Sequence, residues 1–512
     1  MGKKKVLLLA STILIVAMLF SLVGCSNKEG SLVDNSTNDD SVVEIDTDLL
    51  VVGGGGAGMT ATVSAAAKGL DVVLIEKNGF LGGSTGVSSG GMVVTGSNIQ
   101  KELGVTEDTP ESMIEDFLVN GENLNDQEKL EIYANSVGDT VNWLIDDLDF
   151  KMNTARGFYS TAEYAHDRVM FFEDGASGLV KMLKGAIEET NAKVMLDTKG
   201  EELIVEDGVV NGIKAVGGDG KNYRINAKAV LLATGGFGNN VDMLSEDMKT
   251  VLYYGLKSST GDGHLMAKSV NAKFQLMEYG KLYSNGIEIA ERTAKSTSFA
   301  SQAATDISGI LINKEGNRIV NEKASNKEIL DAQFAEEDKT LYMLMDSDSF
   351  EAFLTKIEQN SISQKQIDTW LANNGSIAPI FANADTLEEV AEIAGINVEN
   401  LKTTVEKYNK FVANASDTDF GRPVEYLKDE IGEGPYYIVE QKPRFATTMG
   451  GVVTNENLQI INEDGQLIKN LYAAGELAGG VSGNDSPPGA NVGWALTSGR
   501  LAGLKIAEAL GK

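Results

Sequence analysis

The chain has 512 residues, with 44 lysines and arginines against 74 aspartates and glutamates, so its formal net charge at pH 7 is −30. Such an acidic chain repels a phosphate backbone, which argues against nucleic-acid binding. With 42% hydrophobic and 23% charged residues, the composition is that of a globular protein. One cysteine and two histidines provide no ligand set for an attached haem, an iron–sulfur cluster or a cysteine-based zinc site, so we expect no protein-held metal.

The N-terminus is typical of a secretion signal. Lysines at positions 3–5 precede an apolar run over residues 6–20, which is too short to span a bilayer comfortably. The following Leu-Val-Gly-Cys resembles the bacterial lipobox, in which the cysteine is lipidated and the chain is cut before it. We therefore expect a lipoprotein signal peptide over residues 1–24, a lipid anchor on Cys25, and a location at the outer face of the cytoplasmic membrane. The alternative is an uncleaved membrane anchor with a free cysteine.

Residues 25–46 are polar and acidic, the composition of a flexible tether, and we expect the globular part to begin near Thr47. A dinucleotide-binding βαβ unit is predicted directly after it. An apolar strand over residues 48–52 leads into Gly53, Gly55 and Gly58, which occupy the places of a GxGxxG turn, and a helical run and a second strand ending at Glu76 follow.

Each part of this unit has a physical role. The glycines let the backbone approach a pyrophosphate at the N-terminus of the helix, and the carboxylate of Glu76 accepts hydrogen bonds from a ribose. The alternative is a glycine-rich turn in another kind of α/β sheet.

Further glycine-rich segments favour FAD over NAD. Residues 78–92 follow the βαβ unit directly, a strand over 229–232 ends in Ala-Thr-Gly-Gly, and a strand near 471–473 precedes Gly475 and Glu476. We expect these segments to converge on one ligand. A helix starting near Asn491 would aim its positive end at the part of a flavin where negative charge collects on reduction.

The motifs VVGGGGAGM, LLATGGFG, STGDGHLMA, TMGGVVTNE and PPGANVGWALTSGRLAG resemble those of the fumarate reductase, succinate dehydrogenase and 3-ketosteroid dehydrogenase superfamily of flavoproteins, over about residues 47–510. The resemblance implies an α/β fold with a Rossmann-like FAD-binding domain over 47–282 and 438–512, and an inserted α+β cap, or clamp, over 283–437. Within the cap, apolar residues at helical spacing between 387 and 408 predict a pair of helices whose apolar faces form core.

The resemblance also implies how FAD is held. Ser84 replaces the histidine that binds the flavin covalently in the membrane-bound members, so we expect non-covalent FAD. The residues implied to surround the cofactor are Gly53, Gly55, Gly56, Ala57, Gly58, Glu76, Lys77, Gly83, Ser84, Thr85, Ser89, Gly90, Gly91, Ala233, Thr234, Gly235, Asp262, Glu476, Asn491 and Val492.

Nearly all of the dicarboxylate-binding residues of fumarate reductases are missing. Tyr283-Ser284 stands in place of their His-Pro pair, Asn326 or Lys327 in place of the acid-donating arginine, Thr447 in place of a histidine, and Ser486 in place of an arginine. A buried carboxylate without a cation is costly, so we expect a substrate other than fumarate. The tyrosine that ketosteroid dehydrogenases carry before their C-terminal Pro-Gly is also absent.

Five residues are candidates for catalysis. Tyr283 is the first candidate for proton donor, since a phenol has an ordinary pKa of about 10. Arg444 and Arg292 could hold a carboxylate or polarise a carbonyl, and His166 and Arg168 lie in a polar aromatic segment that could cover the pocket. The alternative for each is packing or a surface ion pair.

The preferred function is a membrane-tethered reductase that passes hydride from flavin N5 to a carbon–carbon double bond conjugated to a carbonyl or carboxylate, as a terminal step of anaerobic respiration. The chain has no haem motif and no second dinucleotide fingerprint, so its electrons would come from a flavinylated or quinol-linked membrane protein or from free flavin. The alternatives are a ketosteroid-type dehydrogenase, an oxidase using oxygen, or a lipoprotein that relays electrons through its flavin.

Overall fold

The computed structural model describes residues 42–512, so the predicted signal peptide, the predicted lipidation site Cys25 and most of the predicted tether lie outside the described residues. The first strand begins at Val43, and the prediction that the tether extends to residue 46 is therefore wrong. Residues 43–46 pair in parallel with residues 223–226. Their side chains are mostly exposed, so this pairing of distant backbones leaves no hydropathy signal.

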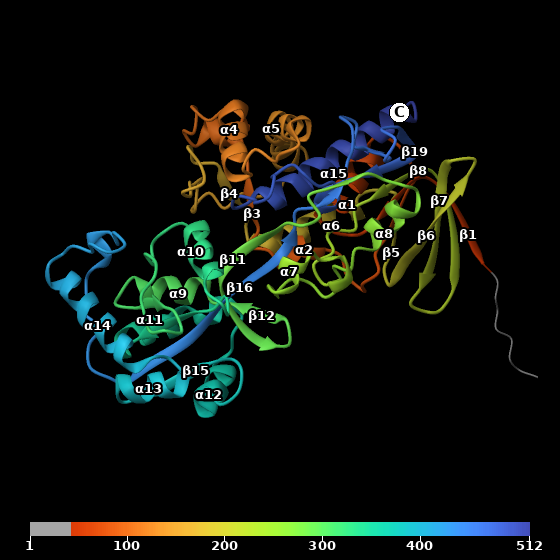
Figure 1. The fold of residues 1–512 in the computed structure, drawn as a ribbon. Helices are drawn as coiled ribbons and strands as arrows, with labels where there is room; N and C mark the ends of the chain where they lie inside the picture. Colours follow the sequence, from red (N-terminus) through yellow and green to blue (C-terminus); the bar gives the residue numbers. More distant parts are fainter. Residues whose placement is uncertain (1–41) are drawn as a thin grey trace, which may run out of the picture. The chain divides into compact units, whose positions relative to one another are not determined.

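The FAD-binding part is built on an eight-stranded sheet. Its strands are β1 (Val43–Val52), β2 (Val72–Ile75), β5 (Lys193–Met195), β6 (Thr198–Glu206), β7 (Val209–Gly217), β8 (Asn222–Leu232), β18 (Gln459–Ile461) and β19 (Leu467–Ala473). Their order is β18-β19-β7-β8-β1-β2-β5, with β6 paired to β7. Figure 1 shows β1, β6, β7, β8 and β19 of this sheet at the end of the molecule where the C-terminus lies. Strands β5, β2, β1, β8 and β19 run parallel, which confirms the predicted βαβ unit.

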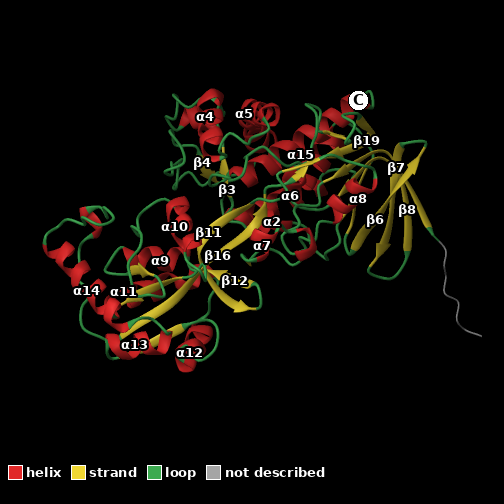
Figure 2. Ribbon diagram, viewed as in Figure 1, coloured by secondary structure: helices red, strands yellow, loops and turns green. Residues whose placement is uncertain are grey.

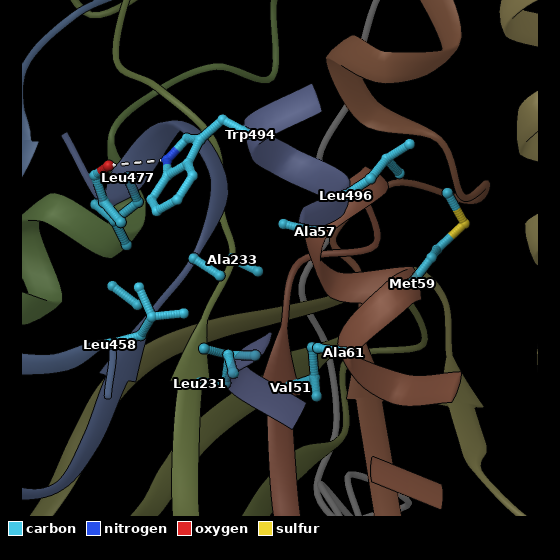
Figure 3. Close-up of a cluster of buried hydrophobic side chains, with 14 of the residues drawn as sticks. Val51, Ala57, Met59, Ala61, Leu231, Ala233, Leu458, Leu477, Trp494 and Leu496 are labelled. Atoms are coloured by element: carbon cyan, nitrogen blue, oxygen red, sulfur yellow. Dashed lines mark hydrogen bonds between the residues drawn. The ribbon is translucent and has the colours of Figure 1, made fainter. Parts of the chain in front are cut away.

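Two helices pack tightly against each other beside this sheet. They are α1 (Gly56–Ala67) and α15 (Ala490–Ala509). A Cβ atom added at Gly499 would lie 2.1 Å from the carbonyl oxygen of Ala57, so only glycine permits this approach. Figure 3 shows the buried cluster between these helices and the sheet, where Val51 and Leu231 meet Ala61, and where the indole N–H of Trp494 donates to a backbone carbonyl.

The remaining elements of this part surround the sheet. They are α2 (Gly83–Val87), β3 (Gly91–Val93), α3 (Asn98–Glu102), α4 (Pro110–Asn120), α5 (Gln127–Asn142), β4 (Val169–Phe171), α6 (Gly175–Glu188), α7 (Glu246–Lys249), β9 (Leu252–Tyr253), α8 (Asp262–Ser269), β10 (Phe274–Gln275) and β17 (Gly451–Val452). None of the helices within residues 42–512 has the length and apolar character that crossing a membrane requires.

The cap contains its own helices and most of a second sheet. Its elements are β11 (Gly280–Ala290), β12 (Thr293–Ser296), α9 (Ser298–Thr305), β13 (Ile310–Ile312), α10 (Asn326–Ala335), β14 (Leu341–Met345), α11 (Ser347–Ile357), α12 (Gln364–Asn373), β15 (Phe381–Ala384), α13 (Leu387–Ala394), α14 (Val398–Ala413) and β16 (Tyr436–Thr448). Helices α13 and α14 confirm the predicted helical pair, and their buried residues form a core with β13 and β14.

Strands β11 and β16 connect the cap to the FAD-binding part (Figure 2). The first half of β16 pairs with β14 and β15 inside the cap, and its second half pairs with β11 and with β9. Strand β11 therefore contains the predicted domain boundary at 283, and β16 contains the one at 437. The hydrogen bonds between strands continue from the cap into the FAD-binding part.

Buried ion pairs hold the cap together. The guanidinium of Arg318 lies 2.8 Å from both Glu322 and Asp417, and Arg422 lies 3.2 Å from Glu322. All four side chains are buried. This network ties the segment after β13 to the loop after α14.

Replacing Arg318 with methionine is expected to lower the free energy of unfolding by about 3–5 kcal/mol, because the buried Asp417 loses its cation and the buried Glu322 keeps only Arg422. Lys214→Met removes the exposed ion pair with Glu202 and should lower the free energy of unfolding by less than ~1 kcal/mol. Urea unfolding of both variants measures the difference, and equal losses would contradict a stabilising role for the buried network.

Candidate active site

A cavity of about 900 Å³ lies where the parallel strands end and extends to the cap. Gly53 follows β1, Glu76 follows β2, Ala233 follows β8, and Ala474 follows β19. The carboxyl ends of parallel strands meet at the same edge of a sheet, which is where α/β proteins bind their ligands. Segments that are far apart in the sequence therefore line one cavity, as the sequence predicts.

The turn between β1 and α1 fits a pyrophosphate. Gly53 has a φ of +107°, and a Cβ atom added at Gly58 would lie 1.8 Å from the carbonyl oxygen of Gly53. Gly55, Gly56 and Ala57 line the cavity at the N-terminus of α1, and no atom beyond the adjoining residues lies within 4 Å of where a Cβ of Gly55 would stand. This space beside a helix N-terminus suits an anionic group.

The adenosine end is marked by Glu76, which is buried and lines the cavity. Its Oε2 accepts a hydrogen bond from the N–H of Gly54 at 2.8 Å, and its Oε1 accepts from the N–H of Asn78 at 2.8 Å. These bonds fix the carboxylate at the end of β2, where a ribose would meet it. Lys77 donates to Asp262 at 2.6 Å, which ties the start of α8 to the same wall.

The flavin end is formed by α15 and Glu476. Asn491 and Val492 line the cavity in the first turn of α15, whose N–H groups have no partner within the helix. The partly buried Glu476 accepts hydrogen bonds from the N–H and the hydroxyl of Thr448, at 2.8 and 2.9 Å, and desolvation raises the pKa of its carboxyl. The groups present therefore fit FAD along the length of the cavity.

Two of the residues implied to surround FAD do not line the cavity. Gly58 supports the turn from behind, and Gly90 allows a close approach to Ala176, whose nitrogen would lie 2.3 Å from an added Cβ atom. The other implied residues all line the cavity, Ser84 included. Non-covalent attachment stays a prediction.

At the cap end of the cavity, strand register brings Tyr283 and Arg444 together. They are directly opposite each other in the β11–β16 ladder, so their side chains are neighbours on one face. The guanidinium of Arg444 lies 4.7 Å from the ring centre of Tyr283 and 4.2 Å from that of Tyr254. All three residues line the cavity.

Arg444 is only 2% exposed and has neutral partners. It donates to the carbonyl and side-chain oxygens of Asn285, at 2.9 and 2.7 Å, and to the hydroxyl of Ser298 at 2.7 Å. Four arginines are buried among residues 42–512, and Arg168, Arg318 and Arg422 each pair with a carboxylate. Arg444 is the exception within this part of the chain, and burial lowers the pKa of its guanidinium. A ligand oxygen would supply the missing charge.

Three predicted catalytic residues lie outside the cavity wall, contrary to expectation. Arg168 is fully buried in ion pairs with Asp108 and Asp116, at 2.7 and 3.0 Å. His166 lies two residues before it and does not reach the cavity. Arg292 lies in the turn after β11, where its backbone N–H donates to Glu288. Their positions are set by tertiary pairing that the local sequence does not reveal.

The substitutions that distinguish this chain from fumarate reductases also have clear places. Thr447 and Ser486 line the cavity, as neutral groups. Asn326 does not line it, because its side chain binds the carbonyl of Leu282 and the N–H of Ser284 and so joins α10 to β11. Lys327 is exposed and pairs with Glu122.

Sequence reasoning missed Tyr254, Asn285 and Ser298. They come from three segments that meet only through the pairing of β9, β11 and β16, and no local motif marks them. The pairing of β11 with β16 shifts register between Tyr283 and Gly286, so simple alternation along β11 does not place Asn285 beside Arg444.

Comparisons with known proteins agree with this geometry. The FAD binding domain family matches residues 48–492. The chain belongs to the FAD binding domain family. It is 32% identical over 468 residues to a urocanate reductase of Eggerthella lenta, a match covering 90% of this chain and 75% of that protein. It is also 32% identical over 469 residues to a fumarate reductase (cytochrome) of Shewanella frigidimarina, covering 90% and 77%.

A solved structure of a flavocytochrome c3 fumarate reductase in its open conformation superposes with a TM-score of 0.74 at 29% identity, covering 91% of this chain and 78% of that one. These matches confirm the superfamily expected from the sequence, the Rossmann-like FAD-binding domain with a cap, and FAD as the cofactor. The chain is an FAD-dependent oxidoreductase related to reductases of carbon–carbon double bonds.

Gly55→Ala is expected to lower FAD affinity by about tenfold or more, because the added methyl group meets no protein atom and instead enters the space for the pyrophosphate. Unfolding of the FAD-free variant should be unchanged. Gly185→Ala, in α6, also meets no neighbouring atom and is the matched control. FAD content by visible absorbance is the measurement, and full FAD content in Gly55→Ala would contradict the assignment.

Proposed function

We propose that this protein is a reductase that adds hydride and a proton across a carbon–carbon double bond conjugated to a carbonyl or carboxylate, in substrates other than fumarate. The observation that carries the proposal is the position of Arg444. It is a buried guanidinium without a carboxylate partner among residues 42–512, and it lies in the wall of the cavity that also fits FAD.

The chemistry divides between the cofactor and the chain. When bound and reduced by an outside electron donor, FAD would supply hydride from N5 of its isoalloxazine ring and return to its oxidised form. The hydride adds to the β-carbon of the substrate, the electron pair of the double bond moves toward the carbonyl or carboxylate oxygen, and a proton adds at the α-carbon. Arg444 orients that oxygen and stabilises the negative charge that develops on it.

Tyr283 is the proposed proton donor. Neither His166 nor His264 lines the cavity, so histidine does not serve this role. Burial raises the pKa of Tyr283, and its phenol therefore keeps its proton at neutral pH. The adjacent guanidinium of Arg444 stabilises the phenolate left after proton transfer, and the proton is restored from solvent between turnovers.

The cellular setting is part of the proposal. We propose a lipoprotein held by Cys25 at the outer face of the cytoplasmic membrane, where it receives electrons from a flavinylated or quinol-linked membrane protein or from free flavin, as a terminal step of anaerobic respiration. The signal-like sequence of residues 1–25 and the lack of a haem motif support this setting.

Anaerobically reduced protein is expected to be reoxidised by enones or monocarboxylate enoates and far more slowly by fumarate. Tyr283→Phe should slow reoxidation about 10²-fold or more while the dissociation constant of the substrate stays within about twofold. Because the donor is the neutral phenol and its pKa is raised, the rate should not fall up to about pH 9. Stopped-flow absorbance of the flavin measures these rates.

The matched control is Tyr436→Phe, which removes an exposed cap hydroxyl that lies outside the cavity wall. Rapid reoxidation by fumarate would contradict the argument from missing cations. No reoxidation by any activated alkene would instead favour a ketosteroid-type dehydrogenase or an electron relay.

A further inference from the structure

The cap end of the cavity contains an anion-binding arrangement at the start of α9. The hydroxyl of Ser298, the first residue of the helix, lies 2.7 Å from Nη2 of Arg444. The first turn of α9 contains no acidic residue. The N–H groups of Ser298 and Ala300 donate to the side chains of Ser296 and Asn360, at 3.2 and 3.3 Å, whereas the N–H of Phe299 makes no hydrogen bond with a described residue and stays available to a ligand. Helix N-termini and guanidinium groups both attract anions, so the two together form a site for one carboxylate.

The arrangement provides one buried cation. Lys295 is the other basic residue in the cap wall of the cavity, but it is only partly buried, and its ammonium group is held by the carbonyl of Ser361 and by Gln366. Arg444 is the buried cation that lacks a carboxylate within the described part of the chain. A second carboxylate on the substrate would be desolvated without a cation of its own, which is costly.

Apolar side chains also line the same cavity. Phe299 follows directly after Ser298, lines the cavity and is 51% exposed, and Val87 lines it from α2 and is 64% exposed. The partly buried Ile289 also lines the cavity. An apolar group that covers these side chains removes their surface from water, which favours binding.

We infer that the cavity binds monocarboxylate enoates that carry an aromatic or other apolar group on the double bond, with the carboxylate at Arg444 and the start of α9 and the apolar group against Phe299 and Val87. The inference rests on the proposed function for the reaction itself, and it adds the class of substrate and the side chains that select it.

Binding of saturated acids separates this inference from the chemistry. The oxidised, FAD-loaded protein is titrated by calorimetry with 3-phenylpropionate, propionate and succinate. We expect 3-phenylpropionate to bind about tenfold more tightly than either of the others. Phe299→Ala should lower the affinity for 3-phenylpropionate about fivefold and change the affinity for propionate by no more than about twofold. The reason is that the phenyl ring is the part of the ligand that would contact this side chain.

Phe80→Ala is the matched control, since Phe80 is 55% exposed and lies outside the cavity wall. It should bind all three acids as the unmodified protein does. Equal affinity for the three acids, or no effect of Phe299→Ala, would overturn the inference. If crotonate still reoxidises the reduced protein in that case, the proposed function stands. If 3-phenylpropionate binds as expected but cinnamate and crotonate fail to reoxidise the protein, the binding site stands and the proposed function falls.

Discussion

The register of the β11–β16 ladder is the constraint on which the candidate site depends. Strands β11 and β16 both run from the cap to the FAD-binding part, and their antiparallel pairing sets Tyr283 opposite Arg444. Side chains alternate between faces along a strand, so a shift of one residue would turn both away from the cavity. The same strand β16 pairs with β14 and β15 inside the cap, and the cap core therefore helps to fix the register.

Charge decides what this site accepts. Desolvating an arginine is costly, and the other buried arginines of the described chain recover that cost through carboxylates of the protein. Arg444 has instead two tyrosine rings, an asparagine, a serine and the start of α9 around it. These groups hold the guanidinium in place without neutralising it, which leaves its charge available to a substrate oxygen. Thr447 and Ser486 add no further cation to the wall.

The cofactor site could be predicted from the sequence, and most of the catalytic end could not. The glycines of the first turn, Glu76 and the start of α15 belong to local motifs whose geometry follows from a strand, a turn and a helix in order. Tyr283 and Arg444 were identified through comparison with family motifs, but their contact depends on pairing between residues far apart in the chain. Arg168 shows the limit of this reasoning, because its carboxylate partners lie in other segments and bury it away from the cavity.

The central claim is that Arg444 holds the carboxylate of the substrate. Calorimetric titration of the oxidised, FAD-loaded protein with 3-phenylpropionate and with the neutral 3-phenylpropan-1-ol tests it most directly, because the two ligands share the apolar part and differ in charge. The account predicts that the acid binds at least about tenfold more tightly than the alcohol, and that Arg444→Gln abolishes this difference while FAD content is unchanged. Equal affinities for acid and alcohol, or a preference that survives in Arg444→Gln, would contradict it.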